Sequence, residues 1–297
     1  MDGGSTDEST KIIKKYAKHL AYWVSEPDYG QSHAINKGLR RATGSVVNWL
    51  NSDDYYQPGA LYAVGQAFLR TDVNVVCGRS RVFRNEDNTG YLSNGTDVYP
   101  ENLAKTIGWA RIDQPETFFR KSVIDRIGLL DERLHYLMDR DWWLKYLFGY
   151  GLDGIVPIPD VLVNFRLHGQ SKTVSQRAAF QVEHDSFFHS LACQFNLASE
   201  QELIATHFTV NDSYAVQLTG MYDPDLVRRA VHYFLLLRAD ECYAVSDYQR
   251  AEVILKSISP KLLLPDDQTL LKKLRFRTTA PIVNLVSLSR KFHRLCN

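Results

Sequence analysis

The sequence has few cysteines, no excess of charge of either sign and no long apolar run. Its 35 Lys and Arg residues nearly balance its 34 Asp and Glu residues, so the net charge of +1 gives no indication of a nucleic-acid partner. The 4 cysteines lie far apart and form no C-x-x-C pair, which argues against zinc and dithiol redox motifs. No apolar run approaches the ~18 residues of a membrane span. These absences favour a globular protein of a reduced, cytoplasmic compartment.

The first residues read as the interior of a domain. Residues 3–4 are a glycine pair suited to a turn, and Ser5 with Glu8 matches the S/T-x-x-E capping box. Apolar residues then recur at helical spacing over 12–20. A glycine turn that feeds a capped helix normally follows a strand, which here could only be Met1. We therefore expect a preceding strand to be missing and Met1 not to be the natural first residue.

Up to about residue 170, short strand and helix patterns alternate. Strands are predicted at 22–25, 46–50, 73–78, 79–90 (turning at polar residues) and 161–168, and helices at 33–44, 58–69, 122–128 and 138–151. Such alternation is typical of an α/β protein with a mostly parallel sheet flanked by helices. The chain beyond is helical without comparable strand signals. We therefore predict an α/β domain over 1–175 and a helical C-terminal region over 176–297.

Two acidic turns carry the strongest chemical signal. In NWLNSDDYY, Asp53 and Asp54 follow a short apolar strand, at the edge where open parallel sheets bind ligands. By the same strand-then-helix logic, Asp2 of DGGSTD ends its own strand, so both turns should line one crevice. Paired carboxylates suit a divalent cation whose shell phosphate oxygens complete. The alternative is that Asp53 and Asp54 only cap a helix or form a turn.

A second acidic cluster lies in LHYLMDRDWWLKY. Asp139 and Asp141 would point about 200° apart on a helix, so at most one can face a site. The other should cap the helix or pair with a base such as Arg140 or Lys145. Both could equally be a plain acidic cap, which the helix dipole favours. The adjacent tryptophans at 142–143 are expected in the core rather than at a cofactor.

A histidine at a predicted strand end completes the set. In RLHGQSKT, His168 follows a strand and precedes a glycine, which puts it at the sheet edge. A lone histidine is usually a surface or hydrogen-bonded residue. Its neutral imidazole can also bind a metal.

Together these stretches strongly resemble the family 2 glycosyltransferases, which have the GT-A fold, a Rossmann-like α/β fold. The resemblance covers about residues 2–175 and rests on four stretches in family order: DGGSTD, SEPDYGQSHAINKGLRRATGSVVNWLNSDDYY, QPETFFRKSVIDRIGLLDERLHYLMDRDWWL and RLHGQSKT. They are similar to the family's nucleotide-binding turn, its DxD metal motif, its acceptor-side segment ending in the ED motif, and its histidine-bearing loop.

The resemblance implies a role for five donor-side residues. Asp2 would contact the uracil or ribose of a nucleotide sugar, and Asn36 would lie beside the donor pocket. Asp53 would be the main ligand of Mg²⁺ or Mn²⁺, with Asp54 nearby on the metal or the donor sugar. His168 would hold the diphosphate or the metal.

On the acceptor side, the resemblance makes Asp139 the catalytic base. The sequence departs from the family pattern at Asn51, where many members carry the first Asp of DxD, and at Met138, where the ED motif usually has Glu. The family's first strand and helix, with the stretch that cradles the base, are also absent. Metal binding would therefore rest mainly on Asp53.

The implied activity is an inverting, metal-dependent transfer of a hexosyl or related sugar. The donor would be a nucleotide-diphosphate sugar, most simply a UDP-sugar, and the acceptor a hydroxyl of a saccharide or lipid-linked molecule in cell-surface glycan synthesis. Two alternatives stay open. One is a hydrolase using Asp53 and Asp139 as acid and base; the other is a non-catalytic, truncated paralogue that binds saccharide or a protein partner.

The end of the chain mixes apolar and basic residues. The stretch TTAPIVNLVSLSRKFHRL contains Arg290, Lys291, His293 and Arg294, which suits a helix lying on an anionic membrane surface. A closing helix packed on the domain is the alternative. The expected location is cytoplasmic, with peripheral association at the inner face of the cytoplasmic membrane as an option.

Overall fold

The computed structural model describes residues 1–84, 90–169, 171–218, 220 and 222–279. The chain forms two compact units. Unit 1 comprises residues 1–97, 111–184 and 217–220, and unit 2 comprises 98–110, 185–216 and 221–297. Residues 98–110, which the sequence-based division assigned to the first part, therefore group with the second unit.

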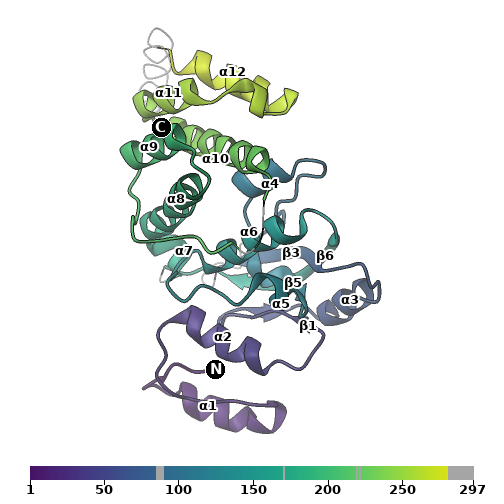
Figure 1. The fold of residues 1–297 in the computed structure, drawn as a ribbon. Helices are drawn as coiled ribbons and strands as arrows, with labels where there is room; N and C mark the ends of the chain where they lie inside the picture. Colours follow the sequence, from purple (N-terminus) through teal and green to yellow (C-terminus); the bar gives the residue numbers. More distant parts are fainter. Residues whose placement is uncertain (85–89, 170, 219, 221, 280–297) are drawn as a thin grey trace, which may run out of the picture. The chain divides into compact units, whose positions relative to one another are not determined.

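Unit 1 is built on a mixed sheet (Figure 1). The strand order is β1-β5-β3-β6-β2, and β4 pairs with β3. The strands are β1 (Val46–Val47), β2 (Tyr55–Tyr56), β3 (Val75–Phe83), β4 (Gly90–Leu92), β5 (Thr117–Arg120) and β6 (Ile155–Arg166).

The α/β class is confirmed, but strand direction differs from the expectation of a mostly parallel sheet. Among the strands that the structure describes, β3 and β6 run parallel, and the other pairings are antiparallel. The reason is that β4 returns along β3, and β5 also runs antiparallel to β3 on that same side, while β6 occupies the other side of β3. Strand–helix alternation carries no information on such returns. A parallel bridge joins Asp2 to Ser25, within the predicted strand 22–25.

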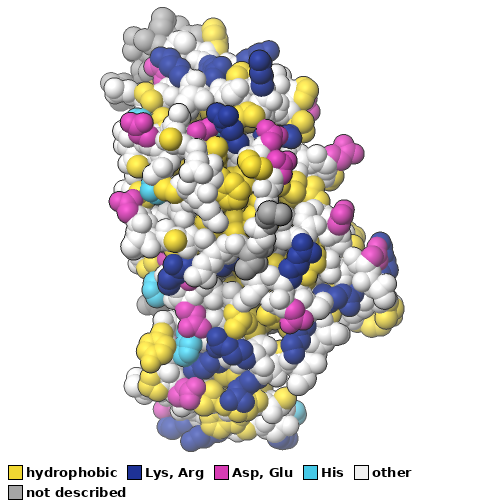
Figure 2. Space-filling model, in the orientation of Figure 1, with side chains coloured by type: hydrophobic (Ala, Val, Ile, Leu, Met, Phe, Trp, Pro, Cys, Tyr) yellow, Lys and Arg dark blue, Asp and Glu magenta, His cyan; other side chains and the backbone are white. Residues whose placement is uncertain are grey.

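Unit 1 also contains helices. They are α1 (Ser9–Tyr16), α2 (Gln31–Arg41), α3 (Ala60–Ala67), α5 (Val123–Ile127), α6 (Met138–Tyr150), α7 (Lys172–Ser175) and the 3₁₀ segments Ala17–His19 and Gln114–Glu116. In the lower part of Figure 2, Lys and Arg side chains gather over α1 and α2. Both helices end in a basic last turn, which suits the negative end of the helix dipole.

The predicted capping box at the start of α1 is wrong. The helix begins at Ser9, and Asp7 Oδ1 accepts a hydrogen bond from the Ser9 N–H at 2.9 Å. The Ser5 hydroxyl donates instead to the Asp2 carboxylate. The Ser5 side chain is therefore bonded to Asp2 and does not cap the helix.

The core of unit 1 fills the space between α3 and the strands. Val76 of β3, Phe118 of β5 and Leu162 of β6 are buried together with α3 side chains. Trp142 and Trp143 are fully buried, and the Trp142 ring lies 4.6 Å from that of Phe119. This confirms that the two tryptophans are core residues.

Unit 2 is helical, as predicted for the C-terminal region. Its helices are α4 (Leu103–Gly108), the second half of α8 (Arg177–Gln194), α9 (Ala198–His207), α10 (Pro224–Ala244), α11 (Tyr248–Ser257), the 3₁₀ segment Pro260–Leu262 and α12 (Pro265–Arg277). Gly108 allows α4 to approach α10 closely, because a Cβ there would collide with the Ala230 carbonyl.

The sequence raised two questions about membranes: whether the basic C-terminal stretch lies on a membrane surface, and whether any segment spans a bilayer. The basic stretch beyond residue 279, with Arg290 to Arg294, lies outside the described residues. Within the part of the chain that the structure describes, no helix combines the length and apolarity needed to span a bilayer.

Candidate active site

A cavity of about 720 Å³ lies within unit 1. Five segments form most of its lining: the loop between β1 and β2, the strands β3 and β4 with the turn that follows, residues 111–116, the residues that lead into α6, and the end of β6 with the following loop. Asp53, Asp54, Asp139 and His168 all belong to the lining. The structure thus brings together residues from three separate sequence motifs.

Asp53 and His168 meet directly in this cavity. The Nε2 atom of His168 lies 3.1 Å from Oδ2 of Asp53, and both side chains are partly exposed. The hydroxyl of Ser171 accepts a hydrogen bond from the His168 backbone N–H at 3.0 Å, which fixes the turn that carries the imidazole. Two residues that are 115 positions apart therefore form one polar pair, because β2, which begins just after Asp54, pairs antiparallel with the end of β6 just before His168.

Asp54 is buried and holds the loop in place. Its Oδ1 accepts from the backbone N–H of Arg166 at 2.9 Å, and its Oδ2 accepts from Nδ2 of Asn51 at 3.3 Å. Burial is the main cause of its raised pKa. Asn51 also accepts from Nε2 of Gln31 at 3.0 Å. Asn51, at the first position of the DxD-like turn, therefore connects Asp54 to α2.

Asp139 lines the cavity from the first turn of α6. Its Oδ1 accepts a hydrogen bond from the Arg140 backbone N–H at 2.7 Å. Burial, the largest cause, raises the pKa of Asp139 to about 6, and the negative charge of Asp113 acts in the same direction. A carboxylate with this pKa is a stronger base than an ordinary aspartate and is still mostly ionised at neutral pH.

The segment that leads into α6 is held by one carboxylate. Glu183 accepts hydrogen bonds from the backbone N–H groups of His135, Tyr136 and Leu137, at 2.8, 3.0 and 2.7 Å. These bonds fix the backbone just before Asp139, so its position in the cavity is set by α8 as well as by α6.

Asp141 points away from the site. It is fully buried and forms an ion pair with Lys145 at 2.7 Å. This pairing confirms the expectation that one of the two acidic residues in this motif pairs with a nearby base.

Asp2 and Asn36 are not among the residues that line this cavity. Asp2 accepts from the Ser25 hydroxyl at 2.6 Å and from the Ser5 N–H at 3.0 Å, and the Ser25 bond is the main cause of its lowered pKa. Asn36 is buried, donates to the Leu130 carbonyl at 2.9 Å and accepts from the Leu130 N–H at 3.0 Å. The donor-side roles of both residues stay predictions.

Comparison with known proteins now identifies the domain. The sequence model of glycosyl transferase family 2 matches residues 1–128. This part of the chain belongs to glycosyl transferase family 2. Among the relatives of the family 2 domain is an uncharacterized glycosyltransferase of Rickettsia typhi, 25% identical over 184 residues, which are 58% of this chain and 55% of the relative.

Another relative is chondroitin synthase of Escherichia coli, 27% identical over 180 residues, 59% of this chain and 25% of that protein. The matched region covers about half the length of the Rickettsia relative and a quarter of chondroitin synthase. A crystal structure of residues 1–349 of S. aureus TarS in complex with UDP-GlcNAc matches with a TM-score of 0.57 and 14% identity, covering 98% of this chain and 81% of that chain. At this identity the likeness shows the fold, and it confirms the expected GT-A fold.

The family 2 motifs did not indicate every polar residue of the cavity. Lys172, four residues after His168, donates to Oε1 of Gln31 at 3.1 Å and to the His135 carbonyl at 3.2 Å. Gln114 donates to the Trp49 carbonyl at 2.8 Å and so fastens residues 114–116 to the loop before Asp53. Neither residue type at these positions signals such a bond, because each partner is distant in sequence.

The residues present fit a divalent cation that a donor diphosphate helps to bind. Among the described residues, no group of three His, Cys, Asp or Glu side chains could hold a metal alone. Mg²⁺ is commonly bound through only one or two carboxylates plus substrate phosphates, and imidazole nitrogen is an accepted ligand of transition metals. Asp53 and His168 supply such a partial set, whereas both oxygens of Asp54 already accept hydrogen bonds.

Proposed function

We propose that this chain is an inverting glycosyltransferase that moves a sugar from a UDP-sugar to an acceptor hydroxyl. The observation that carries the proposal is the presence of Asp139, a carboxylate with a pKa of about 6, in the same cavity as the Asp53–His168 pair. A nucleotide donor held at the pair and a base at Asp139 are the two components that such a transfer requires.

The donor side rests on Asp53, His168 and the loop that follows. Asp53 and His168 would hold Mg²⁺ or Mn²⁺, which, when bound, offsets the charge of the leaving diphosphate. Lys172 adds a positive charge to the same lining. The crystal structures of TarS with UDP-GlcNAc and with UDP support a uridine nucleotide as the donor class. In this proposal Asp54 keeps the loop in register with β6 through the Arg166 N–H.

Asp139 would take the proton of the acceptor hydroxyl as that oxygen attacks the anomeric carbon. The Arg140 N–H fixes Oδ1, which orients the carboxylate for this task. The C–O bond to the diphosphate breaks as the new glycosidic bond forms, so one displacement inverts the anomeric configuration. An α-linked donor would give a β-linked product.

The acceptor is proposed to be a saccharide or lipid-linked molecule of cell-surface glycan synthesis, reached on the cytoplasmic side of the membrane. Similarity to chondroitin synthase supports a role in polysaccharide synthesis. Association with the membrane surface is part of this proposal.

A donor panel tests the proposed function. UDP release from several UDP-sugars would be followed with Mn²⁺, with and without methyl glycosides as acceptors, and the product linkage determined by NMR. We expect one donor to release UDP faster when acceptor is present, with an inverted linkage. UDP release that is independent of acceptor would favour the hydrolase, and UDP binding without release from any donor would favour the non-catalytic protein.

A further inference from the structure

The cavity has a second polar wall that the donor site and Asp139 do not use. It is formed by the facing strands β3 and β4 and by residues 111–116. Arg81 of β3 pairs with Leu92 of β4, and Val82 pairs with Tyr91. Side chains of paired residues point to the same face of a sheet, and those two positions apart share that face. Ser80, Val82, Tyr91 and Ser93 therefore form one continuous surface toward the cavity, whose lining includes all of them.

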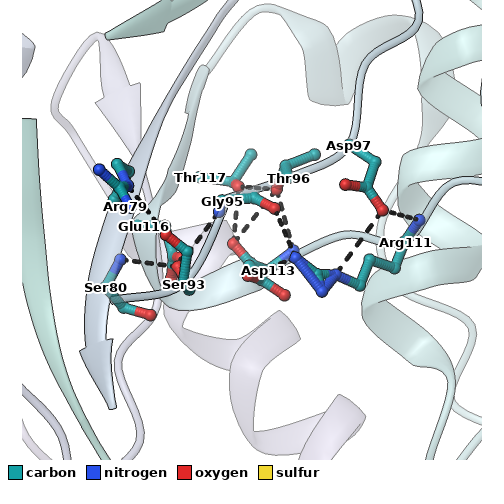
Figure 3. A network of polar contacts seen from close by, with 10 residues as sticks. All are labelled: Arg79, Ser80, Ser93, Gly95, Thr96, Asp97, Arg111, Asp113, Glu116 and Thr117. Carbon is teal, nitrogen blue, oxygen red and sulfur yellow. Dashed lines mark hydrogen bonds and ion pairs between the residues drawn. The ribbon is translucent and has the colours of Figure 1, made fainter. Parts of the chain in front are cut away.

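A buried acid lies behind this surface. Glu116 is only 1% exposed, and its Oε1 accepts from the Ser93 hydroxyl at 3.0 Å (Figure 3). Ser93 is itself held by the backbone N–H groups of Ser80 and Gly95, which donate to its Oγ at 2.9 and 3.2 Å. Burial raises the pKa of Glu116 to about 8, with a smaller contribution from Asp113. At neutral pH its carboxyl group is therefore mostly neutral and can donate as well as accept a hydrogen bond.

The positive charge on this wall is already neutralised. The Arg111 guanidinium lies 3.7 Å from Asp97 and 3.5 Å from Asp113, and it donates to the Gly95 carbonyl at 3.1 Å (Figure 3). An arginine between two carboxylates is a poor partner for a further anion. Carboxyl and hydroxyl groups instead match the hydroxyls of a neutral ligand, which both donate and accept.

An exposed aromatic ring borders the same surface. Tyr91 is 65% exposed although it lines the cavity. The neighbouring Leu92 also leaves much of its side chain exposed. An exposed ring beside converging polar groups suits a ligand that has one apolar face and hydroxyl groups at its edge. A pyranose ring has this combination of surfaces.

We propose that Tyr91, Ser93 and Asp113 form a subsite for a pyranose residue of the acceptor, with the ring stacked on Tyr91 and its hydroxyls bonded to Ser93 and Asp113, while the buried Glu116 holds Ser93 in place from behind. The inference rests on the proposed function and specifies its acceptor as a glycoside rather than a linear polyol. The subsite residues bind and orient the sugar, and Asp139 acts on its reacting hydroxyl.

The test uses the full chain loaded with UDP and Mn²⁺. Binding of methyl α- and β-glucopyranoside and galactopyranoside would be measured by saturation-transfer NMR, with ribitol as the linear polyol. The variants are Tyr91→Ala, Tyr91→Phe, and Tyr62→Ala as the matched control, because Tyr62 is 72% exposed on α3 and does not line the cavity. UDP affinity of each variant, measured by calorimetry, reports whether the donor site is intact.

We expect a pyranoside, and not ribitol, to bind the wild type, Tyr91→Phe and Tyr62→Ala equally. Tyr91→Ala should weaken pyranoside binding about fivefold with unchanged UDP affinity, the factor that corresponds to about 1 kcal/mol of stacking on an aromatic ring. UDP binding without pyranoside binding, equal binding of ribitol, or unaltered pyranoside binding by Tyr91→Ala would overturn the subsite and leave the proposed donor site standing. A wild-type protein that binds no UDP would overturn both.

Discussion

Replacing Asp139 by Asn tests the assignment of the base most specifically. The substitution keeps the size of the side chain, and its amide oxygen can still accept from the Arg140 N–H, so the first turn of α6 should not change. What the variant loses is the ability to take up a proton. Because Asp139 does not contact the Asp53–His168 pair in any described hydrogen bond, UDP affinity should stay the same.

The magnitude follows from the environment of the carboxyl group. With a pKa of about 6, Asp139 is charged in roughly nine molecules of ten at pH 7 and is a markedly stronger base than an exposed aspartate. General-base assistance of this kind typically contributes ~10²–10⁴-fold, which corresponds to about 3 to 5 kcal/mol of transition-state stabilisation. We expect kcat for UDP release to fall by that factor in Asp139→Asn.

The assay combines turnover, donor affinity and pH. In the wild type, kcat/KM should decline below pH about 6, because protonated Asp139 cannot accept the acceptor proton. The residual activity of Asp139→Asn should lack this acid limb. Asp125→Asn is the matched control, since Asp125 is exposed on α5 and lies outside the cavity lining. Full turnover in Asp139→Asn, or an unchanged acid limb, would refute the reasoning.

Three further predictions concern the cavity wall and the core. Glu116→Gln mimics the neutral acid, so its free energy of unfolding relative to wild type should rise with pH between about 4.5 and about 8, at up to about 1.4 kcal/mol per pH unit. In the wild type, burial raises the folded-state pKa of Glu116, so stability is lost as pH increases through this window. Urea denaturation of both proteins at several pH values measures this difference, and a free energy of unfolding that changes with pH identically in both would contradict the idea. Gly95→Ala should unfold or distort the turn at Ser93, because Gly95 has φ +78° and a Cβ there would collide with the Gly78 carbonyl. The pyranoside affinity and the melting temperature of the variant measure this effect. A variant unchanged in both would contradict the turn described. Leu162→Ala should lower the free energy of unfolding, measured by urea denaturation, by about 2–5 kcal/mol, because Leu162 is a core residue. Leu61→Ala, whose side chain is 61% exposed, should lower it by less than about 0.5 kcal/mol. Similar losses at both sites would contradict the described core.

Local patterns predicted the parts of the site that depend on position along one strand or helix. His168 follows β6, as the pattern predicts, but its 3.1 Å contact with Asp53 arises because β2 begins just after Asp54 and pairs antiparallel with the end of β6. The helical repeat separates Asp139 from Asp141 and predicts that only one faces the cavity, as the Asp141–Lys145 pair bears out.

Features that depend on long-range pairing could not be predicted in this way. The direction of β5 against β3 is set by the path of the chain between them, about which hydrophobic spacing says nothing. The second polar wall of the cavity, which includes Tyr91 and Ser93, exists only because β4 pairs with β3 in one register. Asn36 stands in a family-like motif, yet its amide is engaged by the Leu130 backbone, a partner 94 residues away.

The most direct test of the central claim is calorimetry of UDP binding with and without Mn²⁺, for the wild type and for Asp53→Asn. Asp53 lies 3.1 Å from His168 and offers the carboxylate that a cation and a diphosphate would share. The account predicts that Mn²⁺ tightens UDP binding by the wild type and that Asp53→Asn removes this gain. Equal UDP affinity with and without Mn²⁺, or a gain that survives in Asp53→Asn, would contradict it.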